Sequence, residues 1–262
     1  AGPDPIIVHP DVKRMLMQMR SMTAAARTIC YATAVALDVA ARAKDPQVRA
    51  AAAARGALLT PIAKAFSTDI GNEAASLGVQ IHGGMGFIEE TGAAQHLRDA
   101  RITPIYEGTN GIQSIDLVTR KLGVKGGESV WALLSELSDI VKRVEASNDP
   151  AFGSTGAKLR EALESLERTS RWLLERLGTA PNEALAGATP YLRLFGSTLG
   201  GCMLANEAMA ARDSGDQFGD PKRYVTLARY FAENVAVQAP SLERTVVESA
   251  DTVLGADAIL LA

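Results

Sequence analysis

The chain has 262 residues, of which 47% are hydrophobic and 22% are charged, and its formal net charge is −3 at pH 7. This composition predicts a globular chain with a sizeable core. The small negative charge gives no electrostatic reason to expect nucleic acid as a partner.

Cysteine usage and hydropathy indicate the cellular compartment and whether a metal site or a membrane span is expected. Cys30 and Cys202 lie far apart in helical patterns without metal-ligand spacing, so we expect no metal site. We interpret them as small buried hydrophobes in a reducing compartment. No apolar run reaches membrane-spanning length and no secretory signal is visible. We therefore expect a cytoplasmic protein without a membrane span.

Two long helices are predicted in the first third of the chain. Apolar residues recur at helical spacing over about 11–43, and the many alanines favour a helix intrinsically. Asp45 and Pro46 suit the N-cap and first position of a second helix, which covers about 46–81. Pro61 lies inside this second helix and is expected to kink or divide it.

Two loops and two shorter helices follow. Residues 82–87 read His-Gly-Gly-Met-Gly-Phe, and because three glycines in four residues are poor helix material, a loop is expected. A helix is predicted at about 93–100, and a second loop at 102–108. Thr109 suits the N-cap of a further helix, 110–122.

The pattern beyond residue 122 indicates a second helical unit. Residues 123–127 resemble a boundary, and Gly and Pro clusters separate the segments after it. Further helices are predicted at 129–146, 157–177, 191–212, 221–239 and from about 241. No convincing strand pair is visible. The sequence therefore predicts an all-α protein, with an up-and-down helical bundle (1–126) followed by a second helical bundle (127–262).

Two loops carry the candidate chemistry. The glycines of 82–87 let backbone N–H groups approach a ligand closely, because no Cβ obstructs them. The loop 106–109 reads Tyr-Glu-Gly-Thr and ends at a helix N-terminus, which attracts anions. The carboxylate of Glu107 lies beside that end. Each feature alone is ordinary, since most glycine loops are turns and most loop glutamates are solvated charges. Their combination and spacing are more specific.

These motifs resemble a known family. Residues 9–122 are similar to the C-terminal helical domain of acyl-CoA dehydrogenases, with close agreement at 80–87, 98–101 and 106–109. The run His-Gly-Gly-Met-Gly-Phe-Ile-Glu-Glu resembles a subgroup with an added C-terminal helical domain. That subgroup includes members similar to long-chain bacterial acyl-CoA dehydrogenases and to methylthiopropanoyl-CoA dehydrogenases. On this resemblance, residues 127–262 are the added domain.

The resemblance implies roles for the residues around Glu107. Glu107 matches the catalytic base of the family, and the backbone N–H at its position helps to hold the thioester carbonyl. Tyr106 and Gly108 match substrate-binding positions, with Gly108 in the narrow space near the thioester.

The resemblance also implies FAD as the cofactor. Thr109 matches a residue that contacts the pyrophosphate region of FAD. Gln80, Gly83 and Gly84 match a loop that contacts the adenosine half, typically of the FAD on the partner subunit. Many relatives carry Glu or Gln where this chain has Gly111, so one side-chain contact to the cofactor is missing here.

The implied reaction is the α,β-dehydrogenation of an acyl-CoA thioester to a 2,3-enoyl-CoA, as in fatty acid metabolism. The implied partners are the acyl-CoA substrate, an electron-transfer flavoprotein, and further copies of the chain in a homodimer or homotetramer. Family members also have an N-terminal helical domain and a middle β-domain, which this sequence lacks. We therefore expect this chain to be an N-terminally incomplete fragment, inactive alone, that binds FAD weakly or not at all.

Two alternatives stay open at this point. An acyl-CoA oxidase-like enzyme would use the same base and flavin but pass the electrons to O₂. A non-catalytic helical assembly module would keep the motifs without the reaction. The C-terminal extension would either cover a subunit interface or stabilise the fold.

Overall fold

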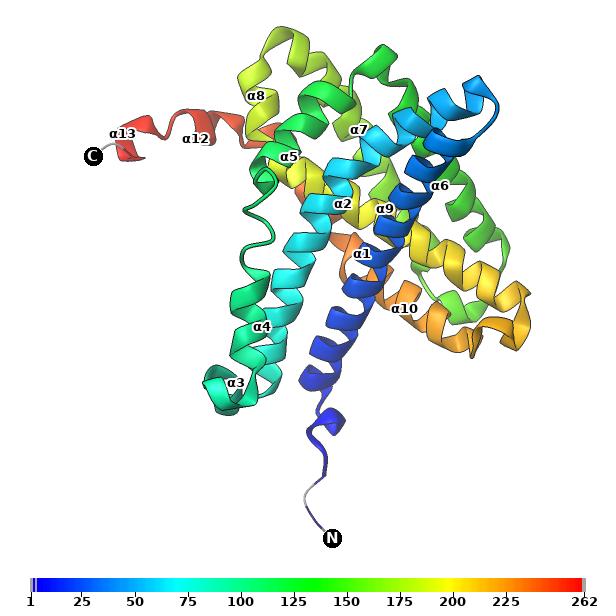
Figure 1. Cartoon of the computed structure of the whole chain (residues 1–262), viewed down its shortest axis with the longest axis vertical. Coiled ribbons are helices and arrows are strands. Elements are labelled where there is room, and N and C mark those ends of the chain that lie inside the picture. The colour runs from blue at the N-terminus through cyan, green and yellow to red at the C-terminus, as the bar shows by residue number, and fades with distance from the viewer. Residues whose placement is uncertain (1, 3, 261–262) are drawn as a thin grey trace.

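The computed structural model describes residue 2 and residues 4–260, and helices joined by turns make up its secondary structure, with no strand in this part of the chain (Figure 1). The expected all-α fold class is confirmed. The helices of the first half are α1 (Pro10–Arg42), α2 (Pro46–Ile81), α3 (Gly84–Phe87), α4 (Ala93–Ala100) and α5 (Asn110–Asp116). Those of the second half are α6 (Glu128–Ala146), α7 (Thr155–Thr179), α8 (Pro181–Ala186), α9 (Ala188–Asp213), α10 (Pro221–Asn234), α11 (Ala239–Glu248), α12 (Ala250–Leu254) and α13 (Asp257–Leu260).

Helices α1 and α2 form a long antiparallel pair, and local signals set where they begin. Pro10 and Pro46 occupy the first positions, where a missing N–H costs nothing. The side chain of Asp45 accepts a hydrogen bond of 2.8 Å from Gln47 N, as expected of an N-cap. Pro61 does not divide α2, which runs continuously through that position. Burial of Pro61 against the core compensates for the hydrogen bond that its ring removes.

Three short segments differ from the sequence-based expectation. Only His82 and Gly83 form a turn, and the expected loop continues as the helical turn α3. Close packing explains this turn, because a Cβ on Gly86 would overlap the carbonyl of Val79 in α2. Helix α8 was not predicted, although Pro181 begins it. Helix α10 ends at Asn234 and is followed by a short 3-10 helix, where one helix to 239 was expected.

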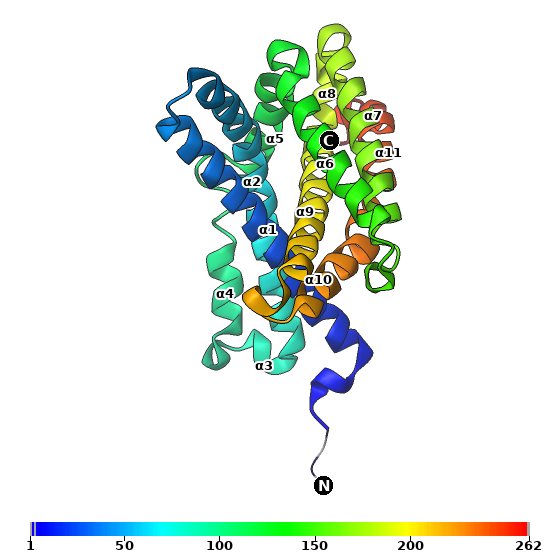
Figure 2. The same cartoon turned by 90° about the vertical axis from the view of Figure 1, so that its right-hand side faces the viewer.

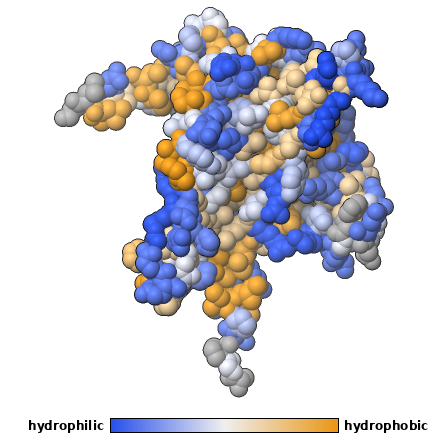
Figure 3. Space-filling view, viewed as in Figure 1, coloured by the Kyte–Doolittle hydropathy of each residue, from blue (hydrophilic) through white to orange (hydrophobic). Residues whose placement is uncertain are grey.

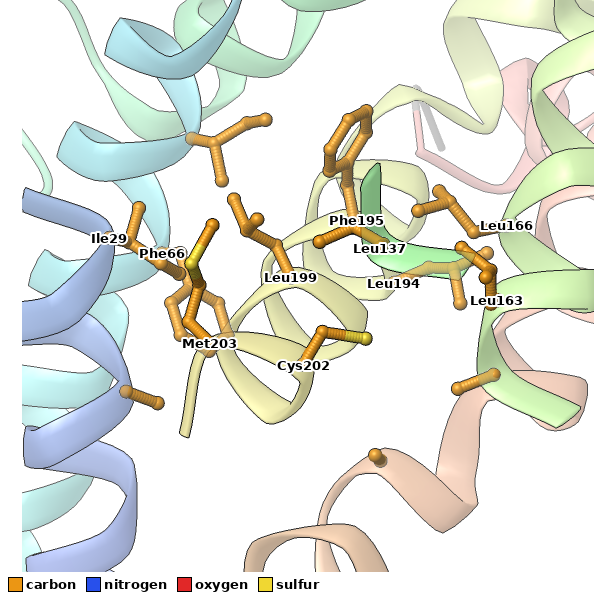
Figure 4. Close-up of a cluster of buried hydrophobic side chains, with 14 of the residues drawn as sticks. Ile29, Phe66, Leu137, Leu163, Leu166, Leu194, Phe195, Leu199, Cys202 and Met203 are labelled. Atoms are coloured by element: carbon orange, nitrogen blue, oxygen red, sulfur yellow. The ribbon is translucent and has the colours of Figure 1, made fainter. Parts of the chain in front are cut away.

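Helix α9 lies at the centre of the molecule and packs against both halves (Figure 2). Most of its residues are buried, and its apolar side chains join one buried cluster with α2, α6 and α7 (Figure 4). Two of its glycines allow close approach: a Cβ would lie 2.5 Å from Phe66 Cγ at Gly196, and 2.9 Å from Ala25 Cβ at Gly200. Across the same junction, Arg193 donates to Glu73 at 2.6 and 3.1 Å.

The segment between the two halves is a tight turn. A short 3-10 helix (Val124–Gly127) contains three residues with positive φ, Lys125, Gly126 and Gly127. A Cβ on Gly127 would lie 2.7 Å from Trp131 Nε1, so this position has room only for glycine. Because the buried cluster spans both halves, the division into 1–126 and 127–262 stays a prediction.

The two cysteines differ in their surroundings. Cys202 is buried in α9, as expected, and burial raises the pKa of its thiol to about 12. Cys30 is exposed on α1, with its Sγ 3.4 Å from Ser67 Oγ, so the expectation of a buried residue is wrong there. Cys202 belongs to the buried cluster and Cys30 does not, which accounts for the difference.

The surface carries apolar areas that the sequence reading did not anticipate. Helix α1 is long and apolar enough to span a membrane by length and composition alone, which corrects the statement that no run reaches this length. A core helix meets the same test, and α1 packs against α2, α9 and α10. Apolar surface also covers the N-terminal segment and the projecting arm of α12 and α13 (Figure 3).

Candidate active site

Glu107 lies on the exposed loop that joins α4 to α5. Its backbone has φ +56°, and that of Gly108 has φ +78°. The left-handed region suits glycine, but it is uncommon for a residue with a side chain and persists only where neighbouring groups hold it. Thr109 then caps α5 as expected, because its Oγ1 accepts a hydrogen bond of 3.3 Å from Ile112 N.

Three hydrogen bonds hold this loop in shape. The N–H of Asn110 donates to Pro104 O at 3.0 Å and closes the loop on itself. Gln113 Nε2 donates to the carbonyl of Glu107 at 3.1 Å. Lys64 Nζ, from the middle of α2, donates to the carbonyl of Gly108 at 2.8 Å. Both left-handed residues therefore have their carbonyl oxygens bound by a side-chain donor.

A polar cluster on α2 anchors the loop through Asn110. Asn110 Oδ1 accepts from Lys64 Nζ at 2.8 Å, and its Nδ2 donates to Asp69 Oδ1 at 2.7 Å and Thr68 Oγ1 at 2.9 Å. Burial lowers the pKa of Lys64, and the charges of Asp69 and Glu107 act against this shift. Burial raises the pKa of Asp69, against the hydrogen bond from Asn110.

This polar cluster was not predicted, although the sequence of α2 contains a signal for it. Lys64, Thr68, Asp69, Asn72 and Glu73 recur at helical spacing within an otherwise alanine-rich and apolar helix. Such a polar stripe on a helix with buried neighbours indicates partners elsewhere in the fold, because buried polar groups are hydrogen-bonded.

Several exposed apolar residues lie close to Glu107 in the chain. Tyr106 is 52% exposed, and Ile105, Ile102 and Ile112 are similarly accessible on the same loop and the first turn of α5. A carboxylate among apolar groups at the surface has the composition of one wall of a ligand site rather than of an ordinary solvated turn. Tyr106 and Gly108, expected to bind substrate, thus share the exposed loop with Glu107.

A cleft of about 910 Å³ opens beside the loop, between α1, α2, α4 and residues 104–111. Thr109, expected to contact the cofactor, lines it together with Gly111, Arg101 and the apolar Leu77. A Cβ on Gly111 would meet only Thr109 Oγ1, at 3.8 Å, so the missing side chain leaves open space. The lining combines Thr109 and Arg101, which suit an anionic group of a ligand, with the carboxylates of Asp69 and Glu73, which do not, and with apolar side chains such as Leu77.

Gln80 lies in the last turn of α2, Gly83 in the turn after it and Gly84 at the start of α3, which is at the end of α2 that lies away from α5 (Figure 1). About 25 Å of helix separates Lys64 from the end of α2 at a rise of ~1.5 Å per residue, so the structure does not bring the two loops together. All three residues are exposed, and Gly83 has φ +59°. No atom lies within 4 Å of a Cβ built on Gly83 or Gly84, which leaves the backbone open to a ligand.

Metal ligands do not gather at either loop. Within residue 2 and residues 4–260, no group of three or more His, Cys, Asp or Glu side chains is arranged to hold a metal ion.

Comparison with known proteins identifies the family. The family model "Acyl-CoA dehydrogenase, C-terminal domain" matches residues 1–122, and "Acetyl-CoA dehydrogenase C-terminal like" matches residues 133–257. The chain is 39% identical over 255 residues to 3-methylmercaptopropionyl-CoA dehydrogenase from Ruegeria pomeroyi, covering 96% of this chain and 43% of that protein.

Two solved structures share the fold. Caenorhabditis elegans ACDH-11 in complex with C11-CoA superposes with a TM-score of 0.71 and 20% identity, over 91% of this chain and 40% of that one. An acyl-CoA dehydrogenase complexed with FAD from Bacillus anthracis gives a TM-score of 0.73 and 18% identity, over 97% and 46%. The chain thus spans less than half the length of these relatives. With both of its halves matched, it belongs to the acyl-CoA dehydrogenase family, as the family's C-terminal helical part.

Proposed function

We propose that this chain is the C-terminal part of a FAD-dependent acyl-CoA dehydrogenase, and that Glu107 is the base that removes the substrate α-proton. The observation that carries the proposal is the exposed Glu107, held with a positive φ on a loop that also exposes Ile105 and Tyr106. The relatives support the substrate class, because one is named for an acyl-CoA substrate and another is complexed with C11-CoA.

The reaction requires a base and a group that stabilises negative charge. The α-proton of a thioester is weakly acidic, so the base must lie within hydrogen-bond reach and the developing enolate must be stabilised. Glu107 accepts the proton, and its backbone N–H donates to the thioester carbonyl. Tyr106 and Gly108, which has no side chain, line the space for the thioester. Bound FAD supplies the acceptor for the β-hydride, which completes the 2,3-enoyl-CoA.

The residues at both loops fit FAD. We propose that Thr109 holds the pyrophosphate region from the cleft, where Arg101 contributes a cation. We propose that Gln80, Gly83 and Gly84 hold the adenosine half of the FAD bound to a partner subunit. The open space above both glycines supports this assignment, and so does their separation from Glu107. Gly111 adds no side-chain contact.

The remaining partners follow from this reaction. We propose an electron-transfer flavoprotein as electron acceptor, a homodimer or homotetramer as assembly, and a cytoplasmic location. The oxidase alternative differs in one measurable product, because O₂ would be reduced to hydrogen peroxide. Reduction of an electron-transfer flavoprotein without peroxide release supports the dehydrogenase, and stoichiometric peroxide release supports the oxidase.

The decisive experiment replaces Glu107 in the full-length protein. Glu107→Gln is expected to lower turnover of an acyl-CoA by about 10²–10⁴-fold or more, since a positioned base contributes that much, while the FAD content stays unchanged. Glu175→Gln, an exposed glutamate on α7, is the matched control and should keep full turnover. Retained turnover in Glu107→Gln would refute the assignment. A Glu107→Ala strain with intact cellular function would instead favour a non-catalytic module.

A further inference from the structure

We propose that Lys64 and Gln113 are positioning residues for Glu107. Each binds one carbonyl oxygen of the two left-handed residues, and together they hold the backbone that presents the carboxylate. The catalytic consequence rests on the proposed function, whereas the structural claim about the loop stands by itself.

The loop needs external support, because its own residues do not supply it. Glu107 is in a region that a side chain disfavours, and Gly108 follows it with the same sign of φ. Both residues are exposed, so no packing against the core fixes them. The backbone hydrogen bonds within the loop, from Ile105 N and Tyr106 N to Ile102 O and from Asn110 N to Pro104 O, do not bind the carbonyl of Glu107 or of Gly108.

Lys64 is suited to supply this support from a rigid element. It is half-buried in the middle of α2, between the fully buried Ile62 and Phe66. Its Nζ donates to Gly108 O and to Asn110 Oδ1, both at 2.8 Å. No carboxylate among the described residues lies within ion-pairing distance of it. The ammonium therefore donates its hydrogen bonds to the loop, at Gly108, and to the first turn of α5, at Asn110.

Asn110 provides a fixed hydrogen-bond acceptor for the Lys64 ammonium. Its amide group donates to Ala65 O, Thr68 Oγ1 and Asp69 Oδ1, at 3.1, 2.9 and 2.7 Å. These bonds fix the side chain against α2, so Lys64 meets a preorganised acceptor. The charge of Lys64 also interacts favourably with the carboxylates of Asp69 and Glu107.

Gln113 supplies the second contact from the opposite side. Its Nε2 donates to Glu107 O at 3.1 Å and lies 3.2 Å from a Cβ built on Gly108. A residue other than glycine at position 108 would therefore press on Gln113. The amide reaches Glu107 only because α5 begins at Asn110, which Thr109 caps.

The first test measures the loop itself in the 262-residue chain. Hydrogen exchange of the Tyr106 and Asn110 amides reports loop opening, because both are hydrogen-bonded within the loop. Lys64→Met and Gln113→Met should each raise exchange there by about 10-fold or more, with the unfolding midpoint little changed. Lys64→Arg should restore part of the protection. Lys142→Met, on the exposed face of α6, is the control and should change nothing.

The second test measures catalysis in the full-length protein. Lys64→Met should lower kcat by about 10–100-fold with KM nearly unchanged, since small displacements of a reacting group cost this much, and Lys64→Arg should recover part of kcat. Gln113→Met removes the second donor without altering α2, and it serves if Lys64→Met folds poorly.

Each outcome separates the two claims. Unchanged loop exchange in both methionine variants overturns the positioning role, whatever the turnover. Faster exchange with unaltered kcat also overturns it, because a loosened loop would then still present Glu107. Retained turnover in Glu107→Gln refutes the proposed base instead, and leaves the exchange result to decide whether Lys64 and Gln113 hold the loop.

Discussion

The loop that carries Glu107 and the central helix α9 are held in place by opposite means. The loop is exposed, and side-chain hydrogen bonds from Lys64 and Gln113 set its conformation. Helix α9 is buried along most of its length, and close apolar contacts at Gly196 and Gly200 set its position.

Helix α2 connects the two regions. Phe66 is fully buried against α9, whereas Lys64, two residues earlier, faces the loop. Packing at the buried junction thus holds α2 in place, and hydrogen bonds from α2 hold a loop that is itself exposed. Four substitutions test how each region is held.

The largest effect is expected at the junction. Phe66→Ala removes a fully buried ring, and truncation of a buried Phe typically costs about 3–5 kcal/mol of unfolding free energy. Because the buried cluster spans both halves, fluorescence of Trp131 and Trp172 and hydrogen exchange in α1 should report one transition at lower temperature. Phe87→Ala, 81% exposed on α3, is the control and should cost under about 0.5 kcal/mol. Separate transitions would show that the halves are independent.

A smaller effect is expected from filling the contact at Gly196. Gly196→Ala adds a Cβ that would lie 2.5 Å from Phe66 Cγ, and overpacking of this kind typically costs about 1–3 kcal/mol. Chemical denaturation should give a lower midpoint with the same slope. An unchanged midpoint would mean that α2 and α9 can separate freely, which contradicts a rigid junction.

A gain in unfolding free energy, rather than a loss, is expected from a substitution on the exposed face of α2. Gly71 is exposed inside the helix, and no atom lies within 4 Å of a Cβ built there. Gly71→Ala should therefore raise the unfolding free energy by about 0.5–1 kcal/mol, through helix propensity alone. The same denaturation measurement checks it, and a loss of stability would indicate a contact that the structure lacks.

The smallest effect on stability is expected at Glu207, a partly buried residue of α9. Burial raises the pKa of Glu207, against a hydrogen bond from Thr28. The unfolded state therefore loses this proton at a lower pH than the folded state, and the contribution of Glu207 to stability falls as pH rises above about 4.3. Glu207→Gln removes this loss, so its stability relative to the parent should increase from pH 4 to pH 7.

The gain should be a few tenths of a kcal/mol, about 0.5 at most, since the group is partly solvated. Thermal melts of both proteins at the two pH values measure it. If the stability of the variant relative to the parent falls over this range, Glu207 is stabilised as a carboxylate in the folded protein. Its surroundings on α9 would then be more polar than the packing indicates.

Much of the helical organisation could be read from local signals. Pro10, Asp45, Pro46 and Thr109 act at the helix starts where they were expected, because capping depends on a few neighbouring residues. The Tyr-Glu-Gly-Thr motif likewise identified the candidate base and the family. Gly84–Phe87 escaped prediction, since its helical turn depends on contact with Val79 rather than on intrinsic preference.

Only the tertiary structure decided how the motif is held. Lys64 and Gly108 are 44 positions apart, and the contact between Phe66 and Gly196 links the two halves of the chain. Local sequence determines which segments become helices and which residue can act as a base, because those properties depend on neighbouring residues. The conformation of Glu107, the position of its supporting donors and the place of α9 depend instead on long-range packing, which brings distant side chains within bonding distance.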